Sequence, residues 1–310
     1  MDFALMTEPQ FGGTYQEQLA AARWAEQAGL VAFARSDHYY FKREPRPEAT
    51  DAFAVLAGLA RETEKIRLCV LVSPITFRHP AVLAKTAATI DQMSGGRLDL
   101  GVGTGWLQLE HDAFGLPFPA LDERFGRLEE ALIYLKAAFA DGPQSFTGRY
   151  YELDADVRPN PVGPMPIIVG GQGPTRTPRL AGTFADEFNH FIAHPSDIAP
   201  KIAKVRRAAQ ASGRDPDRIT MSVMGPVLVG VDETDYRRKL EAAAAARGDE
   251  PEEFERRWAS YGIPLGPPSQ VADTLAGLRG AGITKFYVQH LDLADLAGLD
   301  QTFELLRSST

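Results

Sequence analysis

Asp37-His38 is the residue pair best suited to acid–base chemistry in this sequence, and it follows a short apolar segment near the N-terminus. A histidine titrates near neutral pH, so it can donate or accept a proton, and a neighbouring carboxylate can orient its ring or raise its pKa. A structural interpretation is also open, in which Asp37 caps a loop and His38 packs against Tyr39. The pair is therefore a candidate catalytic site.

Two glycine-rich segments could bind a ligand through exposed main chain. Gly101-Val102-Gly103-Thr104-Gly105 precedes Trp106 and lacks the last glycine of a dinucleotide fingerprint, so a Rossmann interpretation is weak. The segment fits better as a strand end where a planar ligand approaches the backbone, with ligand-free barrel-corner glycines as the alternative. Gly170-Gly171-Gln172-Gly173-Pro174 leads from an apolar segment into a predicted helix. Free N–H groups at such a helix start bind phosphate, and Arg176 could add positive charge; a plain tight turn is the alternative.

Other polar residues form weaker patterns. His190 and His194 have the i, i+4 spacing of helical metal ligands, but a proline follows and no glutamate lies between them, so we predict no metal site. Lys201 and Lys204 could hold an anionic substrate. The sequence contains no nucleophile elbow, P-loop or HExxH motif.

Short apolar segments typical of β-strands alternate with amphipathic helical segments along the chain. The predicted strands cover 2–7, 31–36, 66–72, 97–102, 166–170, 186–192, 219–229 and 283–289. The predicted helices cover 14–28, 51–63, 80–93, 122–140, 175–184, 196–212, 233–247, 268–281 and 295–307. Several strands are continuous apolar runs, as in parallel sheets buried on both faces. Asp91 to Arg97 is interpreted as a helix end and tight turn with an Asp91–Arg97 ion pair.

Eight strand–helix units predict an α/β fold, a (β/α)8 TIM barrel forming a single domain over residues 1–310. An open doubly wound sheet fits the same alternation but usually has fewer strands. Insertions are predicted near 105–121, 142–165 and 248–267, the second with strand-like residues at 149–151. The active site of such a barrel lies at the C-terminal strand ends, which here carry aromatic residues and glycines but few carboxylates. That composition favours a flat conjugated ligand over a sugar or a metal ion.

The composition of the chain excludes several classes of function. The chain has 310 residues, of which 44% are hydrophobic and 24% charged, and its net charge is −8. Nucleic acid is not expected as a partner because a phosphate backbone requires a basic surface, and no apolar segment is long enough for a membrane helix. The single cysteine, Cys69, excludes a disulfide framework and a cysteine-based zinc site. With no secretory signal at the start, we expect an acidic cytoplasmic enzyme that acts on a small molecule.

Taken in order, these motifs resemble those of the bacterial luciferase-like monooxygenase superfamily, and its coenzyme F420-dependent (5-deazaflavin) branch more than its FMN branch. The resemblance covers about residues 1–190. The matching segments are Ser-Asp-His at 36–38, Thr-Phe-Arg-His-Pro at 76–80, Asp-Gln-Met-Ser-Gly-Gly-Arg at 91–97, Gly-Val-Gly-Thr-Gly-Trp at 101–106, Phe-Gly-Leu-Pro-Phe-Pro at 114–119, Glu-Arg-Phe at 123–125, Phe-Thr-Gly-Arg-Tyr-Tyr at 146–151, Val-Gly-Gly-Gln-Gly at 169–173 and Ala-Asp-Glu at 185–187.

The resemblance implies a luciferase-like TIM barrel and an oxidoreductase that transfers a hydride between F420 and a small organic substrate. It implies that His38 is the proton partner, oriented by Asp37, and that Trp106 forms an aromatic wall. It also implies a non-prolyl cis peptide bond near Leu71–Val72. The residues that it assigns to the cofactor are Leu71, Val72, Ser73, Thr76, Gly103, Thr104, Gly105, Gly170, Gly171, Gln172, Gly173 and Arg176.

The resemblance leaves the reaction open in part. The sugar-phosphate dehydrogenases of this branch carry a catalytic glutamate directly after the glycine segment, where this chain has Trp106. This difference favours a reductase that acts on an enone, imine or similar acceptor. An FMN-dependent monooxygenase and a flavin or deazaflavin carrier without catalysis are the alternatives. Because such proteins are commonly dimers, and the helical segments at 51–60 and 80–93 have apolar faces, we also predict a homodimer.

Overall fold

Eight parallel strands close into a barrel in the computed structural model, which describes residues 1–41 and 49–309. Around the barrel the strands follow the order β1-β12-β9-β8-β7-β4-β3-β2. Their bounds are β1 (Asp2–Thr7), β2 (Ala32–Arg35), β3 (Arg67–Pro74), β4 (Leu98–Gly103), β7 (Ile167–Gly170), β8 (Glu187–Phe191), β9 (Thr220–Gly225) and β12 (Lys285–His290). The predicted TIM barrel is confirmed, and the open sheet is excluded.

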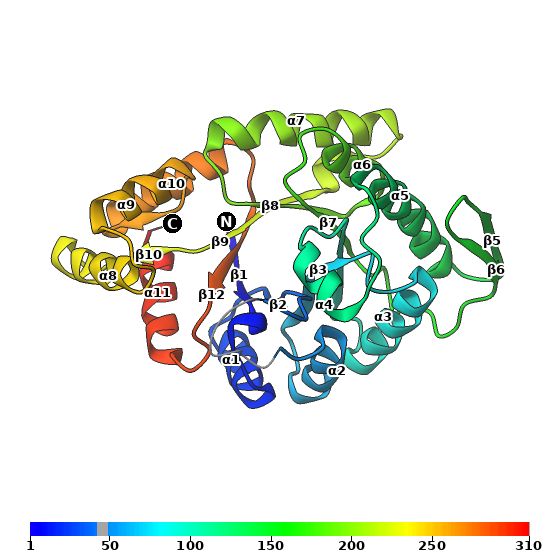
Figure 1. The fold of residues 1–310 in the computed structure, drawn as a ribbon, viewed down its shortest axis with the longest axis horizontal. Coiled ribbons are helices and arrows are strands. Elements are labelled where there is room, and N and C mark those ends of the chain that lie inside the picture. The colour runs from blue at the N-terminus through cyan, green and yellow to red at the C-terminus, as the bar shows by residue number, and fades with distance from the viewer. Residues whose placement is uncertain (42–48, 310) are drawn as a thin grey trace.

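Helices surround the strands as a ring (Figure 1). They are α1 (Tyr15–Gln27), α2 (Ala52–Glu62), α3 (Pro80–Ser94), α5 (Leu121–Ala138), α6 (Arg176–Phe184), α7 (Pro195–Ala211), α8 (Glu233–Ala245), α9 (Pro251–Ser260), α10 (Pro268–Gly280) and α11 (Leu296–Ser308). Their ends follow local capping chemistry. The Asp51 carboxylate accepts the Ala54 N–H at the start of α2, and Gly95 ends α3 in a left-handed conformation with φ of 71°.

The barrel interior is filled with side chains. Its apolar part is a cluster of small and medium side chains, namely Ala4, Met6, Ala32, Ala34, Cys69, Leu71, Ile168 and Tyr287. Its polar part includes an ion pair in which the Lys285 Nζ lies 2.5 Å from the Glu187 Oε2, while the Ser222 hydroxyl donates to the same carboxylate at 2.6 Å. A ligand can therefore bind at the strand ends but not inside the barrel.

Three excursions interrupt the regular alternation. A short helix, α4 (Gln108–Phe114), lies over the strand ends, and a hairpin, β5 (Gln144–Thr147) with β6 (Glu152–Ala155), extends beyond α5 (Figure 1). A small parallel sheet pairs β10 (Leu228–Val229) with β11 (Leu265–Gly266). Two short 3-10 helices, η1 (Pro9–Phe11) and η2 (Pro216–Arg218), complete the elements. No helix among the described residues is both long and apolar enough to cross a membrane.

Three local predictions were wrong. The strand-like residues 149–151 form the turn of the hairpin, because the Glu130 carboxylate accepts their three backbone N–H groups. The strand predicted at 219–229 is split into β9 and β10 around Pro226, which has no N–H to donate. Asp91 and Arg97 do not pair. The Asp91 carboxylate accepts the N–H groups of Leu98 and Val162, whereas the Arg97 guanidinium donates to carbonyls at the end of α2 and just beyond it.

Candidate active site

A histidine–glutamate pair lies at the strand ends. His38 follows β2, and its Nδ1 is 2.9 Å from Oε1 of Glu110, which α4 carries into the site. The second oxygen of Glu110 accepts the backbone N–H of Tyr39 at 3.0 Å. The side chain of Glu110 is 2% exposed and that of His38 is 17% exposed. Because a carboxylate only accepts, Nδ1 of His38 carries a proton, and Nε2 is the nitrogen that can act on a ligand.

The electrostatics favour a protonated His38. Burial on its own lowers the pKa of this imidazole, but the hydrogen bond and the charge of Glu110 outweigh burial, with smaller contributions from the carboxylates of Glu8 and Asp37. The pKa of His38 is therefore raised above its ordinary value of 6.5. At neutral pH this histidine is suited to donating a proton.

The predicted role of Asp37 as the direct partner of His38 was wrong. The Asp37 carboxylate is fully buried and accepts from the Ser73 hydroxyl at 2.7 Å and from both terminal nitrogens of Arg78. Glu110, which lies 72 residues from His38 in sequence, takes the place that the prediction gave to Asp37. Ser73, predicted to contact the cofactor, is likewise committed to Asp37.

Trp106 stands beside this pair at the mouth of the barrel. Its ring is 68% exposed and meets the His38 ring edge-on, with the centroids 5.6 Å apart. The segment that follows is anchored by His111, whose Nδ1 donates to the Leu107 carbonyl and whose Nε2 accepts from the Thr76 hydroxyl at 2.7 Å. Thr76, another predicted cofactor contact, thus holds the α4 segment in place. Trp106 thus lies next to His38, and its role as an aromatic wall stays a prediction.

Three predicted ligand-binding glycines instead surround Val72. A Cβ added to Gly170 would lie 2.8 Å from Cγ1 of Val72, and one added to Gly103 would lie 2.9 Å from its Cγ2. One added to Gly101 would clash with the Val70 carbonyl oxygen and lie 2.8 Å from Cγ1 of Val72. The glycines therefore permit the close approach of β3, whose backbone or side chain occupies the space beside them. The bond between Leu71 and Val72 is a cis peptide, at the predicted place. Leu71 itself belongs to the barrel interior.

The loop between β7 and α6 retains exposed main chain. Gly171 has a φ of 148°, Gln172 is exposed, and the N-cap residue Thr175 makes no side-chain bond to the first turn of α6. The Gly171 N–H is bonded to the Asn189 carbonyl at 3.1 Å, so the N–H groups available to an anion are those that follow it, up to the first turn of α6. Arg176 adds less charge than predicted, since its guanidinium pairs with the Asp122 carboxylate. The Thr104 hydroxyl has only a long contact, 3.4 Å, to the Gly105 carbonyl.

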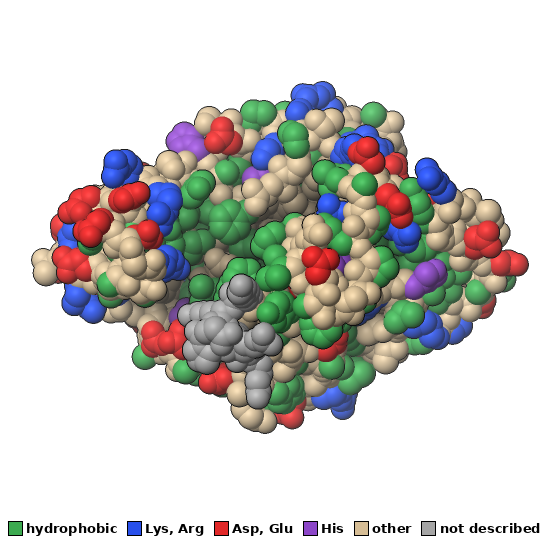
Figure 2. All heavy atoms as spheres, in the orientation of Figure 1, with side chains coloured by type: hydrophobic (Ala, Val, Ile, Leu, Met, Phe, Trp, Pro, Cys, Tyr) green, Lys and Arg blue, Asp and Glu red, His purple; other side chains and the backbone are tan. Residues whose placement is uncertain are grey.

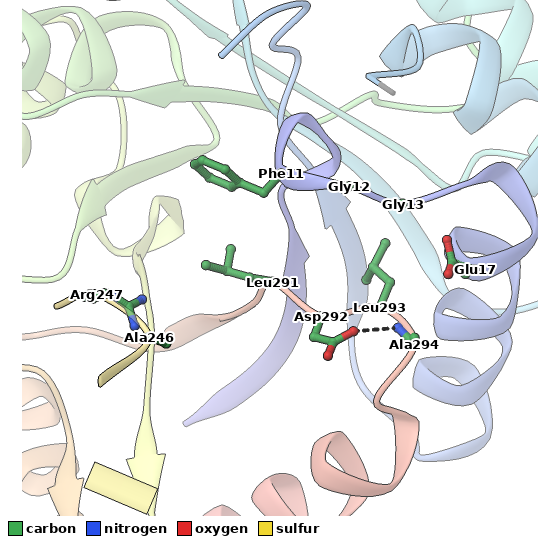
Figure 3. Close-up of a pocket in the computed structure, with 10 residues that line it drawn as sticks. All are labelled: Phe11, Gly12, Gly13, Glu17, Ala246, Arg247, Leu291, Asp292, Leu293 and Ala294. Atoms are coloured by element: carbon green, nitrogen blue, oxygen red, sulfur yellow. Dashed lines mark hydrogen bonds between the residues drawn. The ribbon is translucent and has the colours of Figure 1, made fainter. Parts of the chain in front are cut away.

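A cavity of 810 Å³ opens at the ends of β1 and β12, next to the strand that leads to His38 (Figure 3). Phe11 and Leu291 project into it from the barrel side, and Arg247 faces them from the loop after α8. Hydrophobic side chains gather around the hollow of this face, whereas charged ones gather over α8 and α9 (Figure 2). This cavity can accept a small molecule with apolar and polar parts, although His38, Glu110 and Trp106 are not among the residues that line it.

The remaining predicted polar residues have separate partners. Nε2 of His190 accepts from the Lys201 ammonium at 2.6 Å, and burial, together with the charge of Lys201, lowers the pKa of His190 to about 4. The Lys204 ammonium donates to the Pro174 carbonyl at 2.7 Å. His194 caps α7. Among the residues described, no three His, Cys, Asp or Glu side chains are grouped to hold a metal ion.

Comparison with known proteins identifies the family. Residues 1–285 match the family model described as luciferase-like monooxygenase. The chain belongs to this family. It is 30% identical over 284 residues to an F420-dependent glucose-6-phosphate dehydrogenase of Kineococcus radiotolerans, covering 84% of this chain and 82% of the relative. It is also 30% identical over 240 residues to the pyrimidine monooxygenase RutA of Enterobacter cloacae, covering 74% and 64%.

Solved structures with the same fold include the following two enzymes. An F420-dependent secondary alcohol dehydrogenase in complex with an F420–acetone adduct superposes with a TM-score of 0.83 at 22% identity, covering 100% of this chain and 99% of the other. The monooxygenase RslO1 from Streptomyces bottropensis also has a TM-score of 0.83, at 21% identity and 99% coverage of both chains. The relatives and structural neighbours are oxidoreductases, and this luciferase-like chain is an oxidoreductase of the same family.

Proposed function

We propose that this protein binds coenzyme F420 and transfers a hydride between its deazaflavin and a small organic substrate, in the direction of substrate reduction. The observation that carries the proposal is the His38–Glu110 pair at the barrel mouth, where the Glu110 carboxylate raises the pKa of His38 and so favours its protonated form. The F420-dependent relative at 30% identity supports the choice of cofactor.

The described residues fit such a cofactor. The exposed main chain at Gly171 to Gly173 and the free first turn of α6 suit its phosphate. Val72 and the exposed Trp106 provide apolar contact for a flat ring. When bound, F420 supplies a hydride donor or acceptor at its deazaflavin ring. His38 then delivers the proton from Nε2, while Glu110 fixes the tautomer and Trp106 limits access of water from one side.

Trp106 supports a reductase over a sugar-phosphate dehydrogenase. A catalytic carboxylate at that position would accept a proton from a sugar hydroxyl, whereas an indole cannot. The only carboxylate that contacts His38 in the described chain is Glu110, and its hydrogen bonds favour the protonated imidazole. A proton donor matches the reduction of an enone or imine, in which the substrate gains a hydride and a proton.

An FMN-dependent monooxygenase is the second candidate, because RutA is also 30% identical to this chain. Titration of the purified protein with F420 and with FMN, followed by cofactor fluorescence, separates the two. We expect micromolar or tighter binding of F420 and much weaker binding of FMN; the reverse order would favour the monooxygenase.

Turnover tests the reaction itself. Reduced F420 is incubated with a panel of enones, imines and nitro compounds, and its reoxidation is followed by absorbance. We expect His38→Ala to lower turnover by about 10²–10⁴-fold with little change in cofactor affinity. His194→Ala, which removes a histidine from a helix cap outside the site, is the matched control. A cofactor that binds but is never reoxidised by the wild-type chain would instead indicate a carrier.

A further inference from the structure

Arg78 links four segments around the candidate site. It lies between β3 and α3, its side chain is 12% exposed, and its guanidinium pairs with the buried Asp37 carboxylate at 2.5 Å. The same guanidinium donates to the Tyr39 hydroxyl at 2.5 Å and to the Asp51 carboxylate at 2.7 Å. It also reaches the Ser73 hydroxyl at 3.3 Å. One planar fork thus ties the loop after β2 to the end of β3 and to the start of α2.

His38 lies between Asp37 and Tyr39, the two loop residues that Arg78 binds. On one side is Asp37, bound through its carboxylate; on the other is Tyr39, bound through its hydroxyl. The Tyr39 ring also stacks on Phe77, with centroids 4.6 Å apart and an interplanar angle of 8°. With its neighbours fixed, the main chain at His38 has little freedom to turn the imidazole away from Glu110.

Arg78 also offsets a charge that would otherwise act on His38. The charged groups that face this imidazole are Glu110 from α4, Glu8 from the end of β1, and Asp37, whose carboxylate Arg78 neutralises. Removing the guanidinium would leave the buried Asp37 carboxylate with the Ser73 hydroxyl and the charge of Arg35, but without its direct ion-pair partner, next to the proton donor.

We propose that Arg78 is a positioning residue for proton transfer, acting through Asp37 and Tyr39 to hold His38 against Glu110. The inference rests on the proposed function for its kinetic consequence only. Arg78 binds the two neighbours of His38, and its effect passes through them. A residue of this kind changes kcat rather than cofactor affinity when it is removed.

The test compares Arg78→Met with Arg67→Met. Arg67 pairs with the Asp99 carboxylate at 2.6 Å near the opposite end of the same strand, so its loss removes a similar ion pair away from the site. We expect both variants to lose stability, but only Arg78→Met to lower kcat, by about 10–100-fold, with KM and F420 affinity within a few-fold of wild type. An equal fall in kcat for both variants would show that Arg78 is only structural and would overturn the proposal.

A second measurement needs neither cofactor nor substrate. The titration of the His38 imidazole is followed by NMR in the cofactor-free protein. In Arg78→Met, loss of the Glu110 contact lowers the pKa of His38, whereas the Asp37 charge that is no longer offset raises it. Asp37→Asn combined with Arg78→Met keeps the net charge of the pair unchanged, so we expect His38 in this double variant to titrate at lower pH than in wild type. Unchanged titration in the double variant would overturn the proposal. If the wild-type chain did not turn over with F420, the proposed function would fall, and this titration would still decide the role of Arg78.

Arg78→Lys distinguishes the effect of the positive charge at position 78 from the effect of the hydrogen bonds that the guanidinium makes. It also provides a milder substitution in case Arg78→Met does not fold. A lysine ammonium keeps the positive charge beside Asp37 but cannot bridge Asp37, Tyr39 and Asp51 at once. Because the charge stays but the Glu110 contact is loosened, we expect His38 to titrate at lower pH than in wild type and kcat to remain below the wild-type value. Full wild-type kcat in Arg78→Lys would show that the fork is not needed for positioning and would contradict the proposal.

Discussion

Replacing Glu110 by Gln tests the central pair of the candidate site without needing a ligand. The substitution preserves the size of the side chain and an acceptor oxygen but removes the negative charge beside His38. The wild-type carboxylate is 2% exposed and accepts from the His38 ring at 2.9 Å and from the Tyr39 N–H at 3.0 Å. In the variant, burial dominates the environment of His38, and burial lowers its pKa.

The sign of the pH dependence follows from the raised pKa of His38 in the folded protein. The folded chain binds this proton more tightly than the unfolded chain, whose histidines titrate near 6.5. The resulting stability is fully present below that value and is lost as the pH rises through the folded-state pKa. A hydrogen bond with charged partners contributes about 1.5–3 kcal/mol, against about 0.5–1.5 kcal/mol for neutral partners. We therefore expect Glu110→Gln to cost about 1 kcal/mol more at pH 6 than at pH 9.

Urea unfolding followed by circular dichroism measures this difference. Glu130→Gln is the matched control, since the Glu130 carboxylate binds the hairpin backbone and no histidine, so its cost has no reason to change over this pH range. A Glu110→Gln cost that is equal at the two pH values, or larger at pH 9, would refute the ion pair. In kinetics, the fall of kcat at high pH should move to lower pH in Glu110→Gln, because its His38 loses the proton sooner.

Four further results are expected. Gly171→Ala places a side chain at a φ of 148° and should cost about 1–3 kcal/mol in thermal or urea unfolding and weaken F420 binding in a fluorescence titration. Lys285→Met leaves the buried Glu187 carboxylate without its partner and should cost about 3–5 kcal/mol in urea unfolding, more than Lys285→Met with Glu187→Gln. Gly103→Ala should destabilise the wild type by about 1–3 kcal/mol but cost less in a Val72→Ala background, which a double-mutant cycle measures. The α2–α3 face is expected to form a homodimer, and light scattering at one-chain mass over a range of concentrations would contradict it.

The sequence was sufficient for the barrel because each element carries its own signal. Apolar runs such as Ile66 to Val70 form strands buried on both faces, and capping residues such as Asp51 and Gly95 mark helix ends. The wrong predictions concern segments whose local structure depends on a contact with a residue distant in sequence. The hairpin turn at 149–151 depends on the carboxylate of Glu130, and no pattern within the loop indicates that contact.

The misassigned partner of His38 has a geometric cause. Side chains of consecutive residues in an extended chain point to opposite sides, so Asp37 and His38 are poorly placed to bond each other. Asp37 turns toward Ser73 and Arg78, and His38 turns toward α4. Glu110 lies just past a strand end, but its helix is seven residues long and has no side-chain N-cap, so no local pattern predicts that it lies over β2.

The glycines near the site show why residue type alone does not define a ligand surface. Gly101 and Gly103 on β4 and Gly170 on β7 look like exposed backbone, yet the space beside them is taken by β3, through the Val70 carbonyl at Gly101 and through the Val72 side chain at Gly103 and Gly170. The β7–α6 loop differs, because the first turn of α6 has no side-chain cap on its N–H groups. In the proposed complex the two halves of the cofactor therefore meet different kinds of surface: the ring contacts side chains, whereas the phosphate contacts backbone. A substitution at Val72 should consequently affect how the ring is held, and one at Gly171 how tightly the anion binds.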